Sequence, residues 1–241
     1  AEQRERLPKR QEIQQAVEGI ERDVYQAVLD RILDDGFITR EEAAMIAAAD
    51  GALNLSATAR LEVKKEIFSA AYVEAIEDRE ITQQELDKLS NLMAGLAIPR
   101  EQVKHEIDTV REIIRAQTLT LPMEALDRSL VSVPIQKSED AFYQAPATVL
   151  STRKSKESPR GWEYTVRREG TLVLTNKRIL VVGNGTTAIR YEEISDVDVD
   201  LDEGVVEISK ATSGRPAFIR TAEPVYAGRI IDLLIAGESH G

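Results

Sequence analysis

Apolar residues recur every three or four positions through the first half of the chain, which is the spacing of one face of an α-helix. The pattern continues to about Leu119, and Pro99 stands where it can open the last helix. The stripes are Ile13, Val17, Ile20, Val24 and Val28; Ile67, Phe68, Ala71, Tyr72, Ala75 and Ile76; Leu86, Leu89, Leu92, Met93 and Leu96; and Val103, Ile107, Val110 and Ile114. We therefore predict an all-helical domain over residues 1–119.

The stripe of the first helix, from Ile13 to Val28, also has the spacing of a short coiled-coil seam. It spans about two heptads, whereas a sustained run of three to four is the usual sign of a coiled coil. The pattern is therefore typical of an ordinary packed face, and a homo-oligomer formed through the N-terminal helix is the alternative.

The helical period ends between about Leu119 and Asp140, where Leu-Pro-Met, Val-Pro-Ile and Lys-Ser-Glu-Asp interrupt it. We predict that residues 120–140 form a linker or an irregular packed connection. Over residues 141–241 the period changes to two and β-branched residues dominate. Turn sequences separate the candidate strands, which are Ala141–Thr152, Trp162–Arg168, Thr171–Thr175, Arg178–Val182, Thr187–Tyr191, Ser195–Leu201, Val205–Lys210 and Ala217–Thr221.

A last apolar stripe, from Val225 to Leu234, predicts a C-terminal helix. Many short antiparallel strands closed by one helix are typical of a small, partly open barrel. The predicted fold class is therefore α+β, with an N-terminal all-α domain and a C-terminal bent β-barrel capped by a helix.

Composition narrows the possible partners and compartments. The formal net charge is −11 and 5% of the residues are aromatic, so nucleic acid would be repelled and would find few stacking platforms. There is no cysteine, which excludes disulfides and thiolate sites and fits a reducing compartment. No apolar run approaches the roughly 20 residues of a membrane span, and the charged start is unlike a signal peptide. We expect a cytoplasmic location, with peripheral attachment to a membrane as the alternative.

An acidic turn occurs twice in the helical region. Residues 34–42 (Asp-Asp-Gly-Phe-Ile-Thr-Arg-Glu-Glu) align with residues 77–85 (Glu-Asp-Arg-Glu-Ile-Thr-Gln-Gln-Glu). A calcium loop needs oxygen ligands at its first and third positions, but Leu33 and Ile76 fall at the third. The same residues favour capping boxes in which a threonine and a glutamate open the next helix. A divalent cation site of another kind remains the alternative, with Asp35, Glu42, Asp78 and Glu85 as its candidate ligands.

The motif Asp-Gly-x-Ile-Thr-x-Glu-Glu, repeated between helices and followed by Ala49-Asp50-Gly51, resembles the TerB family of tellurite-resistance and stress-response proteins. The resemblance covers roughly Tyr25 to Leu119. It implies an all-helical domain of paired helical units, whose acidic surface binds metal or partners in membrane-linked stress or defence assemblies. Arg79 replaces the glycine in the second copy, which weakens the metal part of that expectation. The acidic positions that match are Asp35, Glu42, Asp50, Asp78 and Glu85.

The stretch Gly170-Thr-Leu-Val-Leu-Thr-Asn-Lys-Arg-Ile, followed by an Ile189–Val197 strand pair, resembles PH-like and GRAM domains. This resemblance runs from about Ala141 to Ala236. It implies a strongly bent, seven-stranded sheet capped by a C-terminal helix. Domains of this kind bind phosphoinositides or peptides and are rarely enzymes.

Basic residues cluster around the first predicted strand pair. Lys and Arg near an anionic surface each contribute about 1 kcal/mol to binding, so the cluster indicates an anionic lipid surface or a protein partner. The remaining alternative is an intramolecular role, in which these cations pair with the Asp196–Asp202 strand. The candidate binding residues are Arg153, Lys154, Lys156, Arg160, Arg167 and Arg168.

No pattern in the chain indicates catalysis. The two histidines, His105 and His240, lie in an amphipathic helix and in the tail, and no hydrolase or nucleotide-binding motif occurs. We predict a non-catalytic adaptor or scaffold without a cofactor, whose β module docks on a protein or an anionic membrane while its acidic helices engage a second partner. The alternatives are a metal-responsive stress sensor and a structural subunit of a larger assembly.

Overall fold

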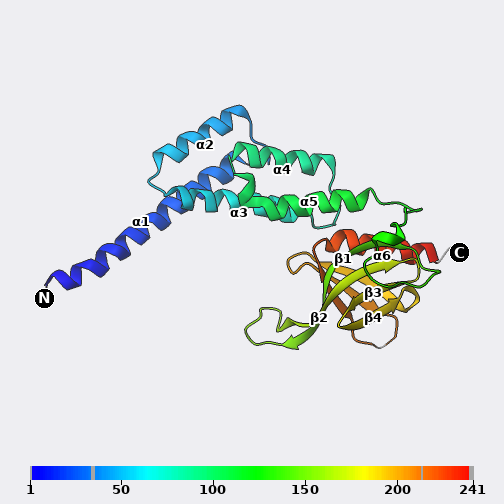
Figure 1. The fold of residues 1–241 in the computed structure, drawn as a ribbon. Coiled ribbons are helices and arrows are strands. Elements are labelled where there is room, and N and C mark those ends of the chain that lie inside the picture. The colour runs from blue at the N-terminus through cyan, green and yellow to red at the C-terminus, as the bar shows by residue number, and fades with distance from the viewer. Residues whose placement is uncertain (1, 34–35, 213, 239–241) are drawn as a thin grey trace. The chain divides into compact units, whose positions relative to one another are not determined.

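The computed structural model describes residues 2–33, 36–212 and 214–238 (Figure 1). The chain divides into two compact units, Ala1–Arg111 and Glu112–Gly241. No helix among the described residues is both long enough and apolar enough to cross a membrane.

The first unit is helical, as predicted. Its core includes Phe68 and Leu92, which belong to the predicted stripes. On α1 the prediction was wrong: the buried side chains are Tyr25 and Leu29 on the neighbouring face, and most of the predicted stripe from Ile13 to Val28 is exposed. A 3-10 turn follows Pro99 and leads into the last helix, whose final residues belong to the second unit. The helices are α1 (Glu2–Ile32), α2 (Arg40–Ala52), α3 (Ala57–Ala75), α4 (Gln83–Gly95) and α5 (Lys104–Gln117), with the 3-10 turn at Arg100–Val103.

The two predicted capping boxes are confirmed. The Thr39 hydroxyl accepts a hydrogen bond from the backbone N–H of Glu42 at 3.2 Å, and the Glu42 carboxylate accepts one from the backbone N–H of Thr39 at 2.8 Å. Thr82 and Glu85 repeat the same two contacts at 3.2 Å and 2.8 Å. Each box satisfies N–H groups that the first turn of α2 or α4 leaves without a partner.

Replacing Thr39 or Thr82 with alanine should lower the free energy of unfolding by about 1 kcal/mol, because each change removes a cap. Urea unfolding followed by circular dichroism at 222 nm measures the effect. Thr58→Ala is the matched control, since Thr58 is exposed within α3 and makes no capping contact. Unchanged stability in both variants would contradict the capping role and point to a ligand role for these turns.

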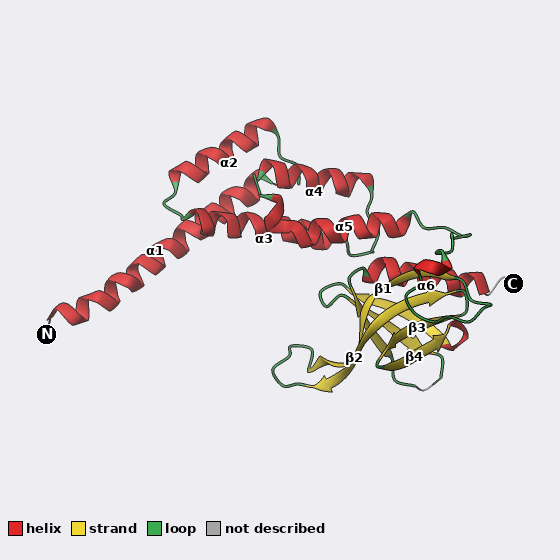
Figure 2. Cartoon of the chain, in the orientation of Figure 1, coloured by secondary structure: helices red, strands yellow, loops and turns green. Residues whose placement is uncertain are grey.

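The second unit is built on one antiparallel sheet. Its seven strands, counted over the described residues, lie in the order β4-β3-β2-β1-β7-β6-β5. The sheet is open, with β4 and β5 at its edges. Figure 2 shows the strands of this sheet in yellow, with β1 to β4 labelled. Helices followed by such a sheet and a C-terminal helix confirm the predicted α+β class. The strands are β1 (Ala141–Lys154), β2 (Trp162–Thr175), β3 (Arg178–Gly183), β4 (Gly185–Arg190), β5 (Ile194–Asp200), β6 (Val205–Lys210) and β7 (Ala217–Thr221), and the helix is α6 (Pro224–Glu238).

The prediction of two separate strands over Trp162–Arg168 and Thr171–Thr175 was wrong. β2 runs without interruption through Glu169 and Gly170, so two of the predicted strands are one. Gly170 pairs with Gly183 of β3, and a side chain at Gly170 would approach the carbonyl oxygen of Val182 to 2.4 Å. The glycine therefore permits close strand contact rather than marking a turn.

α6 closes the core of the second unit. Ala227, Ile230, Ile231 and Leu234 pack against the inward side chains of the sheet. The last turns of α5 hold the start of this helix: Glu112 accepts a hydrogen bond from the backbone N–H of Tyr226 at 2.9 Å. Glu112 thus acts as an N-cap supplied from elsewhere in the same unit.

Residues 120–140 form an irregular packed connection, which is one of the two expected possibilities. Partly buried apolar side chains of this segment cover Ala141, Val173 and Leu180 on the outer face of the sheet. The backbone N–H of Leu126 donates to the carbonyl oxygen of Ala141 at 2.7 Å. The covering residues are Leu126, Val131, Val133 and Ile135.

Candidate functional site

The β1–β2 hairpin extends past the rest of the sheet. β1 pairs with β7 only from Ala147 to Leu150, but with β2 as far as Lys154 opposite Trp162. In the outer part of the hairpin, β1 therefore pairs with β2 alone (Figure 1). Its turn is closed by hydrogen bonds from Ser155 N–H to the Gly161 oxygen at 3.1 Å and from Gly161 N–H to the Ser158 oxygen at 2.9 Å.

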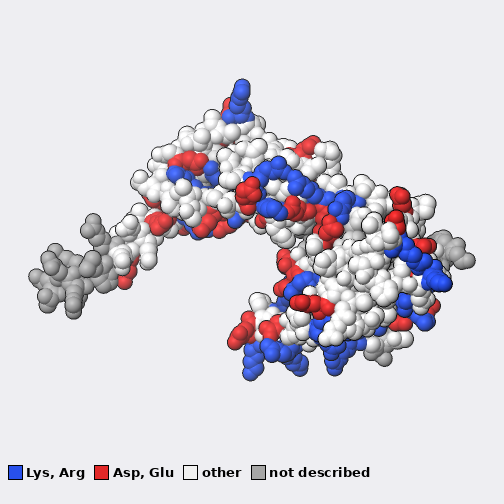
Figure 3. Space-filling view, in the orientation of Figure 1, with Lys and Arg blue, Asp and Glu red and all other residues white. Residues whose placement is uncertain are grey.

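This hairpin is locally basic in an acidic protein. Between Arg153 and Arg168 lie six Lys or Arg residues and two Glu residues, whereas the whole chain carries −11. Figure 3 shows the Lys and Arg side chains gathered at the end of the hairpin, with acidic side chains beside them. The predicted binding residues thus all lie on one hairpin: Arg153, Lys154, Lys156 and Arg160 lie near its turn, and Arg167 and Arg168 lie further back along β2.

Two of the six cations are neutralised within the unit. The Nε atom of Arg153 lies 3.1 Å from Glu163 Oε1 across the hairpin. Arg160 forms ion pairs with Asp200 and, at 3.7 Å, with Asp202. The hydrogen bond from Arg160 to Asp200, and next the charge of Asp200, raise the pKa of Arg160. The predicted pairing with the Asp196–Asp202 strand is therefore correct for Arg160.

The other four cations form what we call the hairpin patch: Lys154, Lys156, Arg167 and Arg168. Among the described residues, none of the four has a carboxylate within ion-pair distance. Lys154 faces the same side as its strand partner Trp162, and Val166, 62% exposed, follows on that side by strand alternation. The hairpin patch therefore combines unneutralised cations with an exposed apolar side chain and a partly exposed indole.

The acidic residues predicted as metal ligands occupy structural positions where they are described. Glu42 and Glu85 are held in the capping boxes, and Asp78 accepts a hydrogen bond from the backbone N–H of Glu80 at 2.9 Å. Asp35 lies outside the described residues. Over the ranges that are described, no three His, Asp or Glu side chains are grouped as a metal site. A metal role for these residues stays a prediction.

The two histidines and the apolar stripe of α1 form no common site in the described residues. His105 is an exposed residue of α5, and His240 falls outside the described residues. On α1, the stripe of Ile13, Val17, Ile20 and Val24 is 46% to 64% exposed. Homo-oligomerisation through this helix also stays a prediction.

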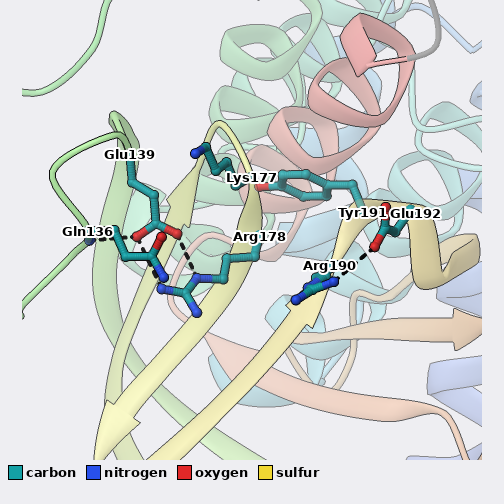
Figure 4. Close-up of a pocket in the computed structure, with 7 residues that line it drawn as sticks. All are labelled: Gln136, Glu139, Lys177, Arg178, Arg190, Tyr191 and Glu192. Carbon is teal, nitrogen blue, oxygen red and sulfur yellow. Dashed lines mark hydrogen bonds and ion pairs between the residues drawn. The ribbon is translucent and has the colours of Figure 1, made fainter.

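A polar pocket at the β2–β3 turn was not predicted. It has a volume of about 400 Å³ and lies at the other end of β2 from the hairpin patch (Figure 4). Lys177 and Arg178 reach it from the turn and the start of β3, and Arg190 from the end of β4. Glu192 reaches it from the 3-10 turn Tyr191–Glu193, and Glu139 from the segment before β1. No sequence pattern indicated this pocket, because it joins segments that are far apart along the chain.

Glu139 and Arg178 form the buried part of this pocket. Two hydrogen bonds join them, from Arg178 Nε at 2.7 Å and Nη2 at 3.2 Å, and the Glu139 side chain is 1% exposed. Burial by itself would raise the pKa of Glu139. The hydrogen bonds from Arg178 and from the Gln136 backbone, with the charges of Arg178 and Lys177, outweigh burial and lower that pKa. Glu139 is therefore ionised at neutral pH.

Comparison with known proteins adds little to this picture. No family model and no curated protein matches the chain. The DH/PH domains of PDZ-RhoGEF, solved in complex with GTP-gamma-S activated RhoA, are 13% identical with a TM-score of 0.30, covering 76% of this chain and 53% of that one. The linker-DH/PH domains of p115-RhoGEF are 12% identical with a TM-score of 0.29, covering 92% of this chain and 70% of that one. The chain spans about half the length of the first of these structures, and likenesses of this size carry no argument about function.

Proposed function

We propose that this chain is a non-catalytic adaptor whose β unit docks on an anionic surface through the hairpin patch. The observation that supports the proposal is a group of four cations on the β1–β2 hairpin that no carboxylate of the described residues neutralises, together with the side chains of Trp162 and Val166 on the same hairpin. An anionic membrane is the surface we test first, because it would take both the cations and the apolar side chains. An acidic protein partner is the alternative surface.

The expected attraction is modest. Four cations at about 1 kcal/mol each give about 4 kcal/mol, which corresponds to a dissociation constant of about 1 mM before any apolar contact is added. The net charge of −11 opposes approach, but salt screens it over about 8 Å at physiological ionic strength. Binding should therefore be reversible and salt-sensitive, as suits a docking module.

The test is liposome flotation of the full chain with and without phosphatidylserine at low and physiological salt. The wild type should float only with the anionic lipid, and Lys154→Glu/Lys156→Glu should abolish flotation. Arg100→Glu/Arg229→Glu makes the same change in net charge at exposed positions outside the hairpin and should still float. If both variants lost binding equally, net charge rather than the hairpin patch would be responsible.

Absence of flotation at every lipid composition would rule out the membrane as the docking surface. The acidic protein partner would then be sought by pull-down with the same pair of variants.

Three finer assignments are part of this proposal and are supported by sequence motifs alone: a TerB-like helical domain that engages a second partner, a GRAM-like β unit and a stress-response role. A metal-responsive role through Asp35, Glu42, Asp78 and Glu85 is the alternative, and a ligand of the folded state would reveal itself as a higher melting temperature.

A further inference from the structure

The polar pocket at the β2–β3 turn contains two directly opposed arginines. Arg178 begins β3 and Arg190 ends β4, and the register pairs them across the two strands. Side chains paired in this way lie on the same face with their Cβ atoms about 5 Å apart, and like charges so placed destabilise the sheet. Lys177, next in the chain to Arg178, adds a third cation to the same pocket (Figure 4).

The two carboxylates of the pocket neutralise its cations only in part. The Glu139 carboxylate accepts hydrogen bonds from the Nε and Nη2 atoms of Arg178. The Glu192 Oε1 atom accepts one from Arg190 Nη1 at 3.2 Å. The Arg190–Glu192 pair is exposed on both sides, so it contributes little and is easily exchanged. Three cations against two carboxylates leave the pocket with an excess positive charge.

Several N–H donors of these cations remain available. Within the described part of the chain, the Nη1 atom of Arg178 and the Nε and Nη2 atoms of Arg190 have no hydrogen-bond acceptor. The Lys177 ammonium donates to the Ser138 hydroxyl at 2.8 Å, which uses one of its three N–H groups. These donors surround a cavity of about 400 Å³.

Guanidinium groups match the oxygens of a phosphoryl group, because their planar N–H forks bind two oxygens at once. An anion held between Arg178 and Arg190 would also replace their mutual repulsion with attraction. We propose that this pocket is a binding site for a phosphoryl group, either inorganic phosphate or the phosphate monoester of a small molecule. Arg190 and Lys177 bind its oxygens, and Arg178, fixed by Glu139, provides the floor of the site.

The experiment is isothermal titration calorimetry of the full chain with inorganic phosphate and, separately, with glycerol 3-phosphate, each in chloride buffer of matched ionic strength. We expect saturable binding of at least one of the two anions. Arg190→Gln and Lys177→Gln should each weaken it about tenfold, as the loss of one charge-assisted contact predicts. Both residues are outside the buried pair, so these variants should keep the wild-type circular dichroism spectrum.

Arg229→Gln is the matched control, because Arg229 is exposed on α6, does not line the pocket and carries the same charge. It should bind with wild-type affinity. Tighter binding of the ester would mean that the natural ligand carries an organic group; equal or tighter binding of phosphate would identify the free anion. No saturable binding of either anion, or equal losses in Arg190→Gln and Arg229→Gln, would overturn the proposal.

Discussion

Replacing Arg178 with methionine is expected to lower the free energy of unfolding by about 3–5 kcal/mol at pH 7, because it leaves the Glu139 carboxylate buried without its cation. Glu139 is 1% exposed and ionised, so it cannot recover the lost contact from water. The backbone N–H of Gln136, which donates to Glu139 at 2.8 Å, would be its remaining donor in the pocket. Urea unfolding followed by the fluorescence of Trp162, the single tryptophan and part of the second unit, measures the change.

The sign of the pH dependence makes this prediction specific. In the wild type the pKa of Glu139 is lowered, so its ion pair stabilises the fold above the usual carboxyl pKa of 4.5 and that contribution is lost as the pH falls through the lowered value. In Arg178→Met the unpaired carboxyl is desolvated and its pKa should rise. The variant would then be protonated at mildly acidic pH, and its deficit against the wild type should shrink from pH 7 to pH 4.

A second substitution separates the buried charge from simple loss of packing. Glu139→Gln/Arg178→Met removes both charges and keeps an amide oxygen that can accept the hydrogen bond from Gln136. Because no charge is then buried, the double variant should be more stable at pH 7 than Arg178→Met alone. A double variant that is less stable than the single one would show that the ion pair is not the source of the loss.

The contacts that sequence analysis identified correctly are local ones. Thr39 and Glu42 lie three residues apart, so the geometry of one helical turn decides their pairing. The β1–β2 hairpin was likewise evident from strand alternation and its turn, which placed the basic residues together. Such features need no knowledge of how distant segments pack.

The contacts that sequence analysis missed or left open join residues far apart in the chain. Glu139 and Arg178 are separated by 39 positions, and no periodicity links the segment before β1 to the β2–β3 turn. Arg160 and Asp200 are 40 positions apart, and here the sequence could only offer pairing as one of three uses of the basic residues. The pocket required the register of β3 on β4, which is a property of the folded sheet.

Asp50 shows how a motif position can have a structural use. It matched an acidic position of the TerB-like pattern, yet in the structure its carboxylate accepts hydrogen bonds from the Tyr25 hydroxyl and, at 2.8 Å, from the Lys64 ammonium. Burial first, then the hydrogen bond to Asp50 and its charge, raise the pKa of Tyr25, which therefore stays a hydrogen-bond donor at neutral pH. Asp50 thus joins α1, α2 and α3 within the helical unit.

Asp50→Ala should lower the free energy of unfolding by about 2–3 kcal/mol, because it leaves the buried Lys64 ammonium and the buried Tyr25 hydroxyl without their common acceptor. The Lys64 side chain is only 10% exposed, so water cannot solvate its ammonium group when Asp50 is removed. The Asp50 side chain is 32% exposed, so water can partly solvate its carboxylate when Lys64 is removed. For the same reason Lys64→Met should cost less than Asp50→Ala, since Asp50 keeps the Tyr25 hydroxyl and some contact with water.

Urea unfolding followed at 222 nm, where helices dominate the signal, measures both variants and the double variant Asp50→Ala/Lys64→Met. The double variant should be more stable than Asp50→Ala, because it no longer buries an unpaired ammonium, and it should still fall below the wild type by the cost of the unpaired Tyr25 hydroxyl. Strict additivity of the two single losses would mean that Asp50 and Lys64 do not interact, and the loss in Asp50→Ala would then come from its contact with the Tyr25 hydroxyl.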